Sequence, residues 1–140
     1  MTESNSRLIV ALHRLEVHAG PLPADQTEPG ITWAVSLRQN EDGVQIWGYL
    51  RRHGEEGFGQ TQSVAFLNRP EWSSAAPDVR PAIATWVEKY VSETMFDTGR
   101  RALQSQAALM DFQFDIDPQA PEAAPTFDED DASEGALHPA

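Results

Sequence analysis

Apolar and polar residues alternate with a period of two in four segments of the first half of the chain, a pattern typical of half-buried β-strands. In the first segment, Ile9, Ala11, Leu15 and Val17 are expected to share one face. Two short polar stretches, 40–43 (NEDG) and 53–57 (HGEEG), separate the last three segments and are typical of hairpin turns. The predicted strands therefore include an antiparallel meander and span residues 7–18, 31–39, 44–52 and 58–68.

The hydrophobic period changes to that of a helix after Asp78. Apolar residues then recur at spacings of three and four, and this pattern continues to Leu109. Gly99 interrupts it at a cost of about 1 kcal/mol relative to alanine, so we expect a kink or a close contact there. The sequence thus predicts an α+β fold, in which a four-stranded antiparallel sheet is followed by one long or kinked C-terminal helix.

The 140 residues are most simply one domain, with 40% hydrophobic residues. Residues 1–6 are polar and are expected to be a frayed N-terminus, and residues 7–118 are expected to form the single α+β domain. Residues 119–140 are rich in Ala, Pro, Asp and Glu, a composition that predicts a disordered acidic tail.

The net charge of −12 is concentrated near the C-terminus. Residues 1–110 carry 13 acidic and 10 basic side chains, whereas residues 111–140 carry nine acidic and no basic ones. Nucleic acid is not an expected partner, because phosphate binding requires clustered Lys and Arg. The chain contains no cysteine, which excludes disulfides and thiolate metal sites. No apolar run approaches the length of a membrane helix, so we expect a cytoplasmic protein without membrane insertion.

Catalytic motifs are missing from the sequence. The four histidines, at positions 13, 18, 53 and 138, do not have the spacing of metal ligands. No nucleophile-elbow motif is present, and the Gly57–Gly59 segment lacks the third glycine of a phosphate-binding loop. We therefore expect a protein that is not an enzyme and that uses no cofactor or metal.

Aromatic residues are the most informative feature of the predicted sheet. Trp47 and Tyr49 alternate away from the aliphatic face of their strand, and one helix can cover only one face of a sheet. Such residues can be a few exposed aromatics on ordinary amphipathic strands, or they can form an interaction surface. On the second interpretation, the client- or partner-binding residues are Trp33, Trp47, Tyr49, Phe58 and Phe66.

The segment MFDTGRR carries Phe96, then Gly99 and Arg100, and DFQFDIDP follows at residues 111–118. An aromatic residue, a small residue and an arginine at this spacing, in a long helix after four strands, resemble the SecB export-chaperone family. The family pattern has a proline after the aromatic residue at the position of Phe112, and a final helix, and this sequence has neither.

The resemblance implies a tetramer built as a dimer of dimers, with long helices packed between sheets. It also implies grooves that hold unfolded polypeptides without ATP. We accordingly expect a homo-oligomer, either a dimer or a tetramer. Its expected interface residues are Trp86, Tyr90, Phe96, Gly99 and Arg100.

Two functions are consistent with these observations. The first is a SecB-like, ATP-independent chaperone that binds unfolded or partner polypeptides through apolar and aromatic grooves. The alternative is a small non-enzymatic adaptor or inhibitor that binds one folded protein through its aromatic sheet face. A third possibility, an acidic mimic of nucleic acid, is disfavoured because the excess of carboxylates lies in the predicted tail.

Overall fold

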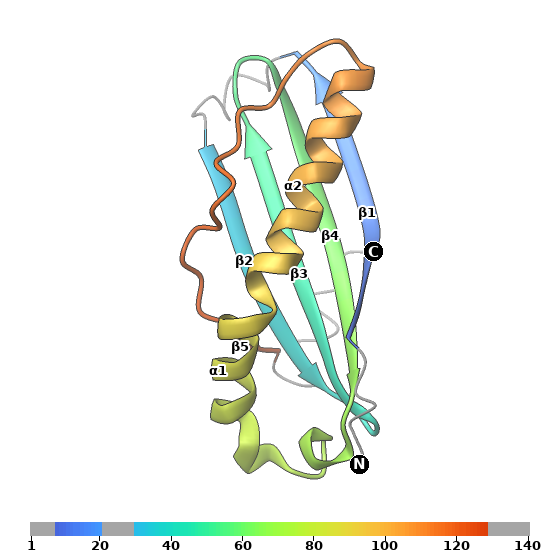
Figure 1. Cartoon of the computed structure of the whole chain (residues 1–140), viewed down its shortest axis with the longest axis vertical. Helices are drawn as coiled ribbons and strands as arrows, with labels where there is room; N and C mark the ends of the chain where they lie inside the picture. Colours follow the sequence, from blue (N-terminus) through green and yellow to red (C-terminus); the bar gives the residue numbers. More distant parts are fainter. Residues whose placement is uncertain (1–7, 21–29, 129–140) are drawn as a thin grey trace.

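The computed structural model describes residues 8–20 and 30–128, which form a β-sheet with two helices on one face (Figure 1). Neighbouring long strands are antiparallel, whereas a short fifth strand runs parallel to β2. The order across the sheet is β1-β4-β3-β2-β5. Its strands are β1 (Ile9–Ala19), β2 (Gly30–Gln39), β3 (Gly43–His53), β4 (Gly57–Asn68) and β5 (Thr126–Phe127). The fold is therefore α+β as predicted, but the described sheet is mixed and five-stranded instead of four-stranded and antiparallel.

Strands β2, β3 and β4 form the predicted meander. At the first turn, the Asn40 side chain accepts hydrogen bonds from the amides of Asp42 and Gly43, each at 2.9 Å. Gly43 has a φ of 153°, in the region that favours glycine. At the second turn, the Gly54 amide donates to the Gly57 carbonyl at 3.0 Å. The turn residues expected from the sequence therefore close both hairpins.

Strand β1 pairs with β4 and contains an irregularity that the sequence pattern does not reveal. The register shifts between Leu12 and Arg14, as in a β-bulge. Because side chains alternate with a period of two, one extra residue reverses the faces beyond it. Leu15 and Val17 therefore lie opposite Thr61 and Gly59 on the helix side, and not with Ile9 and Ala11 as predicted.

The region predicted as one long or kinked helix forms two helices. They are α1 (Arg80–Tyr90) and α2 (Ser92–Leu109), and they meet at Val91, whose φ and ψ are −116° and −37°. Two short 3₁₀ turns, η2 (Pro70–Trp72) and η3 (Pro77–Val79), precede them. Pro81 lies in the first turn of α1, where its missing N–H costs no helical hydrogen bond. The break thus falls at Val91, while Gly99 lies within α2.

Small residues on β4 allow α2 to approach the sheet closely. A Cβ on Gly99 would lie 2.6 Å from the Thr61 hydroxyl oxygen and 3.2 Å from Cδ2 of Leu50. A Cβ on Gly59 would lie 2.7 Å from Cδ2 of Leu103. Since contacts this short do not occur, a larger side chain at either glycine would force the neighbouring side chain or the helix to shift. The glycine in the helix therefore serves contact with the chain's own sheet.

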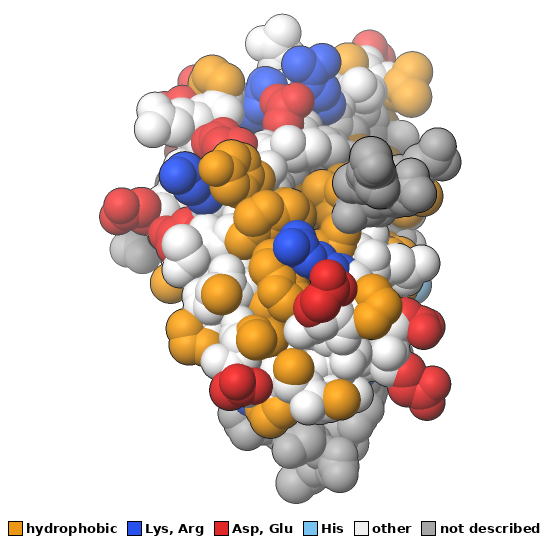
Figure 2. Space-filling model, turned by 60° about the horizontal axis from the view of Figure 1, so that its bottom comes forward, with side chains coloured by type: hydrophobic (Ala, Val, Ile, Leu, Met, Phe, Trp, Pro, Cys, Tyr) orange, Lys and Arg blue, Asp and Glu red, His pale blue; other side chains and the backbone are white. Residues whose placement is uncertain are grey.

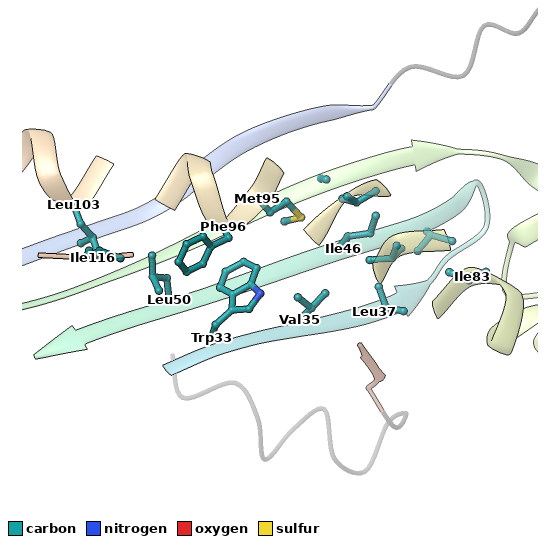
Figure 3. Packing of buried hydrophobic residues seen from close by; sticks show 14 of the residues in the cluster. Trp33, Val35, Leu37, Ile46, Leu50, Ile83, Met95, Phe96, Leu103 and Ile116 are labelled. Carbon is teal, nitrogen blue, oxygen red and sulfur yellow. The ribbon is translucent and has the colours of Figure 1, made fainter. Parts of the chain in front are cut away.

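The hydrophobic core lies between the two helices and the facing side of the sheet (Figure 3). At its centre the rings of Trp33 and Phe96 meet edge to face, with centroids 5.3 Å apart. Such aromatic pairs stabilise a fold beyond the burial of their area. Other fully buried members are Leu37, Ile46, Leu50, Ile83, Val87, Val91, Met95 and Leu103.

The chain after α2 forms an extended C-terminal strap (residues 111–128) that runs along the β2 side of the sheet to β5 (Figure 1). Asp111 adopts a φ of 67° and ends α2 in a Schellman arrangement, in which the Phe112 amide donates to the Ala107 carbonyl at 3.0 Å. Phe114 and Ile116 are then buried in the core. The part of the expected disordered tail from residue 119 to 128 is therefore described and includes a strand. Residues 129–140 of that tail, and the expected frayed residues 1–6, lie outside the described residues.

Candidate functional site

The face of the sheet opposite the helices is uncovered by any described element. It carries an aromatic face, defined here as His13, Trp47, Tyr49, Val64 and Phe66. The Trp47 and Tyr49 rings lie nearly parallel, with an interplanar angle of 13° and centroids 6.4 Å apart. The His13 ring stands edge-on against Trp47 at 5.2 Å. Tyr49 and Phe66 have exposed fractions of 37% and 46%, so this face presents large apolar side chains to solvent.

Strand geometry explains why these residues share a face. Trp47 and Tyr49 are two positions apart on β3, and Trp47 is directly opposite Val64 on β4. Phe66 is opposite Ile9 of β1, which has an exposed fraction of 55% and extends the apolar area to the sheet edge. The indole N–H of Trp47 donates to the Gln45 side chain at 2.9 Å, which satisfies its one polar group. The Trp47 ring therefore offers contact area without an unpaired indole N–H.

The five residues predicted to bind clients do not all lie on one surface. Trp47, Tyr49 and Phe66 lie together on the aromatic face. Phe58 lies on the same side of the sheet but is only 8% exposed, with the Arg51 guanidinium 5.4 Å from its ring centroid. Trp33 points to the opposite side and belongs to the core, so it is not available to a partner.

The residues predicted for an oligomer interface are also divided. Phe96 is fully buried against Trp33, and Gly99 faces β4 of its own chain. Arg100 pairs with Asp97 at 2.5 Å and donates to Gln104 at 3.1 Å, both within α2. The close helix contact expected at this motif is thus made within the chain.

Trp86 and Tyr90, the other two predicted interface residues, lie on the surface of α1. Trp72 joins them, with its ring centroid 5.5 Å from that of Trp86. Together with Pro81, Ala82, Thr85 and Lys89, these rings line a shallow groove of about 540 Å³. Figure 2, in which the α1 end of the molecule comes forward, shows hydrophobic side chains gathered between scattered charged ones. Trp72 was not a predicted site residue, because its sequence position indicates only a loop.

Among the ionisable groups of the described residues, Tyr49, Asp97 and Glu16 have shifted pKa values. Burial, followed by the nearby Asp128 carboxylate, raises the pKa of Tyr49 above its usual value. A hydrogen bond from Arg100 is the main cause of a lowered pKa at Asp97. Hydrogen bonds from His18 and Gln60 lower the pKa of Glu16 at the edge strand. In residues 8–20 and 30–128, no cluster of three or more His, Asp or Glu side chains is suited to hold a metal ion.

No protein-family model, curated protein or solved structure matches this chain. Within the described part of the chain, neither helix combines the length and hydropathy required to cross a membrane.

Proposed function

We propose that this chain is an ATP-independent, SecB-like polypeptide-binding protein that holds unfolded or partially folded chains on its aromatic face. The observation that carries the proposal is the uncovered sheet face, where Tyr49 and Phe66 are exposed and Trp47 lies half-buried beside Tyr49. Exposed apolar patches of this kind usually mark interaction sites.

The chemistry of the aromatic face suits many different sequences. Aromatic rings gain contact area with apolar side chains without requiring a fixed pattern of hydrogen-bond partners. The sheet face is open, so an incoming segment does not have to fit a closed cavity. Both properties favour the binding of unfolded segments over recognition of one small molecule.

We further propose that the protein assembles into a homo-oligomer through β1. This strand lies at one edge of the sheet, and edge strands readily pair with other chains. Leu12 and Leu15 on its helix-facing side have exposed fractions of 40% and 37%. Pairing of two copies would cover these leucines, so we expect a dimeric or larger mass by light scattering on a sizing column.

The experiment that tests polypeptide binding compares one client protein in two states. The client is mixed with this protein either native or unfolded by reduction of its disulfides, and co-elution is followed on a sizing column. The chaperone proposal requires binding of the unfolded client and not of the native one. Failure to bind unfolded clients, together with recovery of a single folded partner, would favour the adaptor alternative.

A further inference from the structure

The outer edge of β2, on the side away from β3, pairs with the much shorter strand β5 of the same chain. Strand β2 has ten residues, whereas β5 has two. In the described part of the chain, β5 pairs only with Ser36 and Leu37, and the Asp128 amide donates to the Leu37 carbonyl at 2.9 Å. Proteins commonly protect long sheet edges because the unpaired N–H and C=O groups attract other strands.

The remainder of the strap covers this edge without forming a strand. It contains three prolines, Pro118, Pro121 and Pro125, which have no N–H to donate to a neighbouring strand. Near the start of β2, the strap and Ile31 instead border a pocket of about 370 Å³, with Arg52 on its wall. A proline-free segment could therefore pair with more of β2 than the strap does.

Specific side chains hold the end of the strap in place. The Arg80 guanidinium lies 4.8 Å from the centroid of the Phe127 ring, a cation–π arrangement. Arg80 is oriented by a hydrogen bond from its Nε to the Gln39 side chain at 3.0 Å. The Ser36 hydroxyl donates to the Asp128 carboxylate at 2.5 Å. These contacts recognise an aromatic residue that is followed by an acidic one.

The recognition elements belong to the folded framework and not to the strap. Ser36 and Gln39 lie on β2, and Arg80 begins α1. The side-chain amide of Gln39 also donates, through Nε2, to the backbone carbonyls of Trp72, Ser73 and Ala76. These hydrogen bonds fix the loop before α1. Release of the strap end would therefore leave a preformed site.

We propose that the outer edge of β2 is a strand-addition site for extended polypeptides that carry an aromatic residue followed by an acidic one. Residues 126–128 are its tethered occupant, which a longer, proline-free segment of a partner displaces. Added strands gain affinity from backbone hydrogen bonds and specificity from side-chain sites, here Arg80 and Ser36. This site borders the aromatic face, because Ser36 is opposite Trp47 and the Asp128 carboxylate lies near Tyr49, but strand addition at β2 does not depend on chaperone activity.

The proposal is tested by measuring peptide affinity with fluorescence anisotropy. The labelled probe is a nine-residue peptide of alternating Thr and Val that ends in Phe-Asp. The tethered residues 126–128 compete with the peptide at a millimolar effective concentration. Weaker binding of this segment to β2 should therefore tighten peptide binding by about tenfold or more. We expect this gain in full-length Phe127→Ala. Asp128→Pro removes the amide that donates to Leu37 and the carboxylate that accepts from Ser36, and it should give the same gain. This variant replaces Phe127→Ala in the test if Phe127→Ala does not fold. Melting curves by circular dichroism establish that each variant is folded.

A second peptide with Leu in place of Phe tests the role of Arg80. In Phe127→Ala, the Phe peptide should bind more tightly than the Leu peptide, and this preference should disappear when Arg80→Gln is added. Unchanged affinity in both folded strap variants, or a preference that persists without Arg80, would overturn the proposal. A loss of oligomeric mass in Phe127→Ala with no gain in peptide affinity would assign the edge to a second copy, and would also overturn it.

Discussion

Gly99 of α2 lies against Thr61 of β4 so closely that a Cβ on the glycine would come within 2.6 Å of the threonine hydroxyl oxygen. Alanine is favoured over glycine within a helix by about 1 kcal/mol, so helix propensity alone predicts that Gly99→Ala stabilises the protein. The contact predicts the opposite. Overpacking of a buried site costs about 1–3 kcal/mol, and Thr61 is a short, branched side chain with little freedom to move.

We therefore expect Gly99→Ala to lower the free energy of unfolding, measured by urea denaturation, by up to about 2 kcal/mol, which is the overpacking cost less the gain in helix propensity. Addition of Thr61→Ala should recover part of this loss, because it removes the atom that the new methyl group meets. Ser105→Ala, at an exposed position of the same helix, is the matched control and should be neutral or slightly stabilising. A stabilised Gly99→Ala would show that α2 does not approach β4 as described.

Asp111 ends α2 in the left-handed conformation, at a φ of 67°. Glycine adopts this conformation without the steric cost of a Cβ and is the usual residue at this position of a Schellman motif. We expect Asp111→Gly to raise the free energy of unfolding by about 0.5–1 kcal/mol and Asp111→Val to lower it. Thermal and urea unfolding of the three proteins measure this order, and a destabilised glycine variant would contradict the described end of the helix.

Asp97 accepts hydrogen bonds from Arg100 and Arg101, at 2.5 and 2.7 Å. The bond from Arg100 is the main cause that holds the carboxyl pKa below its usual value in the folded state. A lowered folded pKa means that the stabilisation is present above the unfolded pKa, about 4, and is lost as the pH falls through the folded value. Because the group is partly exposed, we expect only about 0.2–1 kcal/mol.

Asp97→Asn should therefore be less stable than the parent protein at pH 7, and the difference should shrink as the pH is lowered below about 4. Urea unfolding of both proteins at pH 7, 5 and 3 gives the comparison. A difference that stays constant over this range would mean that the carboxylate charge contributes nothing to stability.

Much of the sheet could be predicted from the sequence because its signals are local. Turn residues such as Asn40 and Gly43 determine the hairpin by themselves, and alternation identifies the strands on either side. The bulge at residues 12–14 was not predictable, because a single added residue in β1 leaves no compositional mark. It alone moves Leu15 and Val17 to the other face.

The candidate binding residues were harder to predict, because they depend on which face of the sheet the helices cover. Alternation places Trp47 away from the aliphatic residues of its strand and Trp33 in phase with Val35 and Leu37, but it does not by itself show that the helices cover the aliphatic face. In the structure Trp33 meets Phe96 in the core, whereas Trp47 remains on the open face. The docking of Phe127 was missed for a similar reason, since its partner Arg80 is distant in sequence and the surrounding Pro and Ala residues indicate disorder.

The central claim, that the aromatic face holds unfolded polypeptides, is tested most directly by light scattering of a denatured client that aggregates on dilution. The parent protein at stoichiometric amounts should suppress the rise in scattering. The double variant Tyr49→Ser/Phe66→Ser should lose most of this effect while its melting temperature stays close to that of the parent. Leu109→Ser, which changes an exposed apolar residue at the end of α2, is the control and should retain the effect. If the parent protein does not suppress aggregation, or if the double variant suppresses it equally well, the proposed function of the aromatic face is wrong.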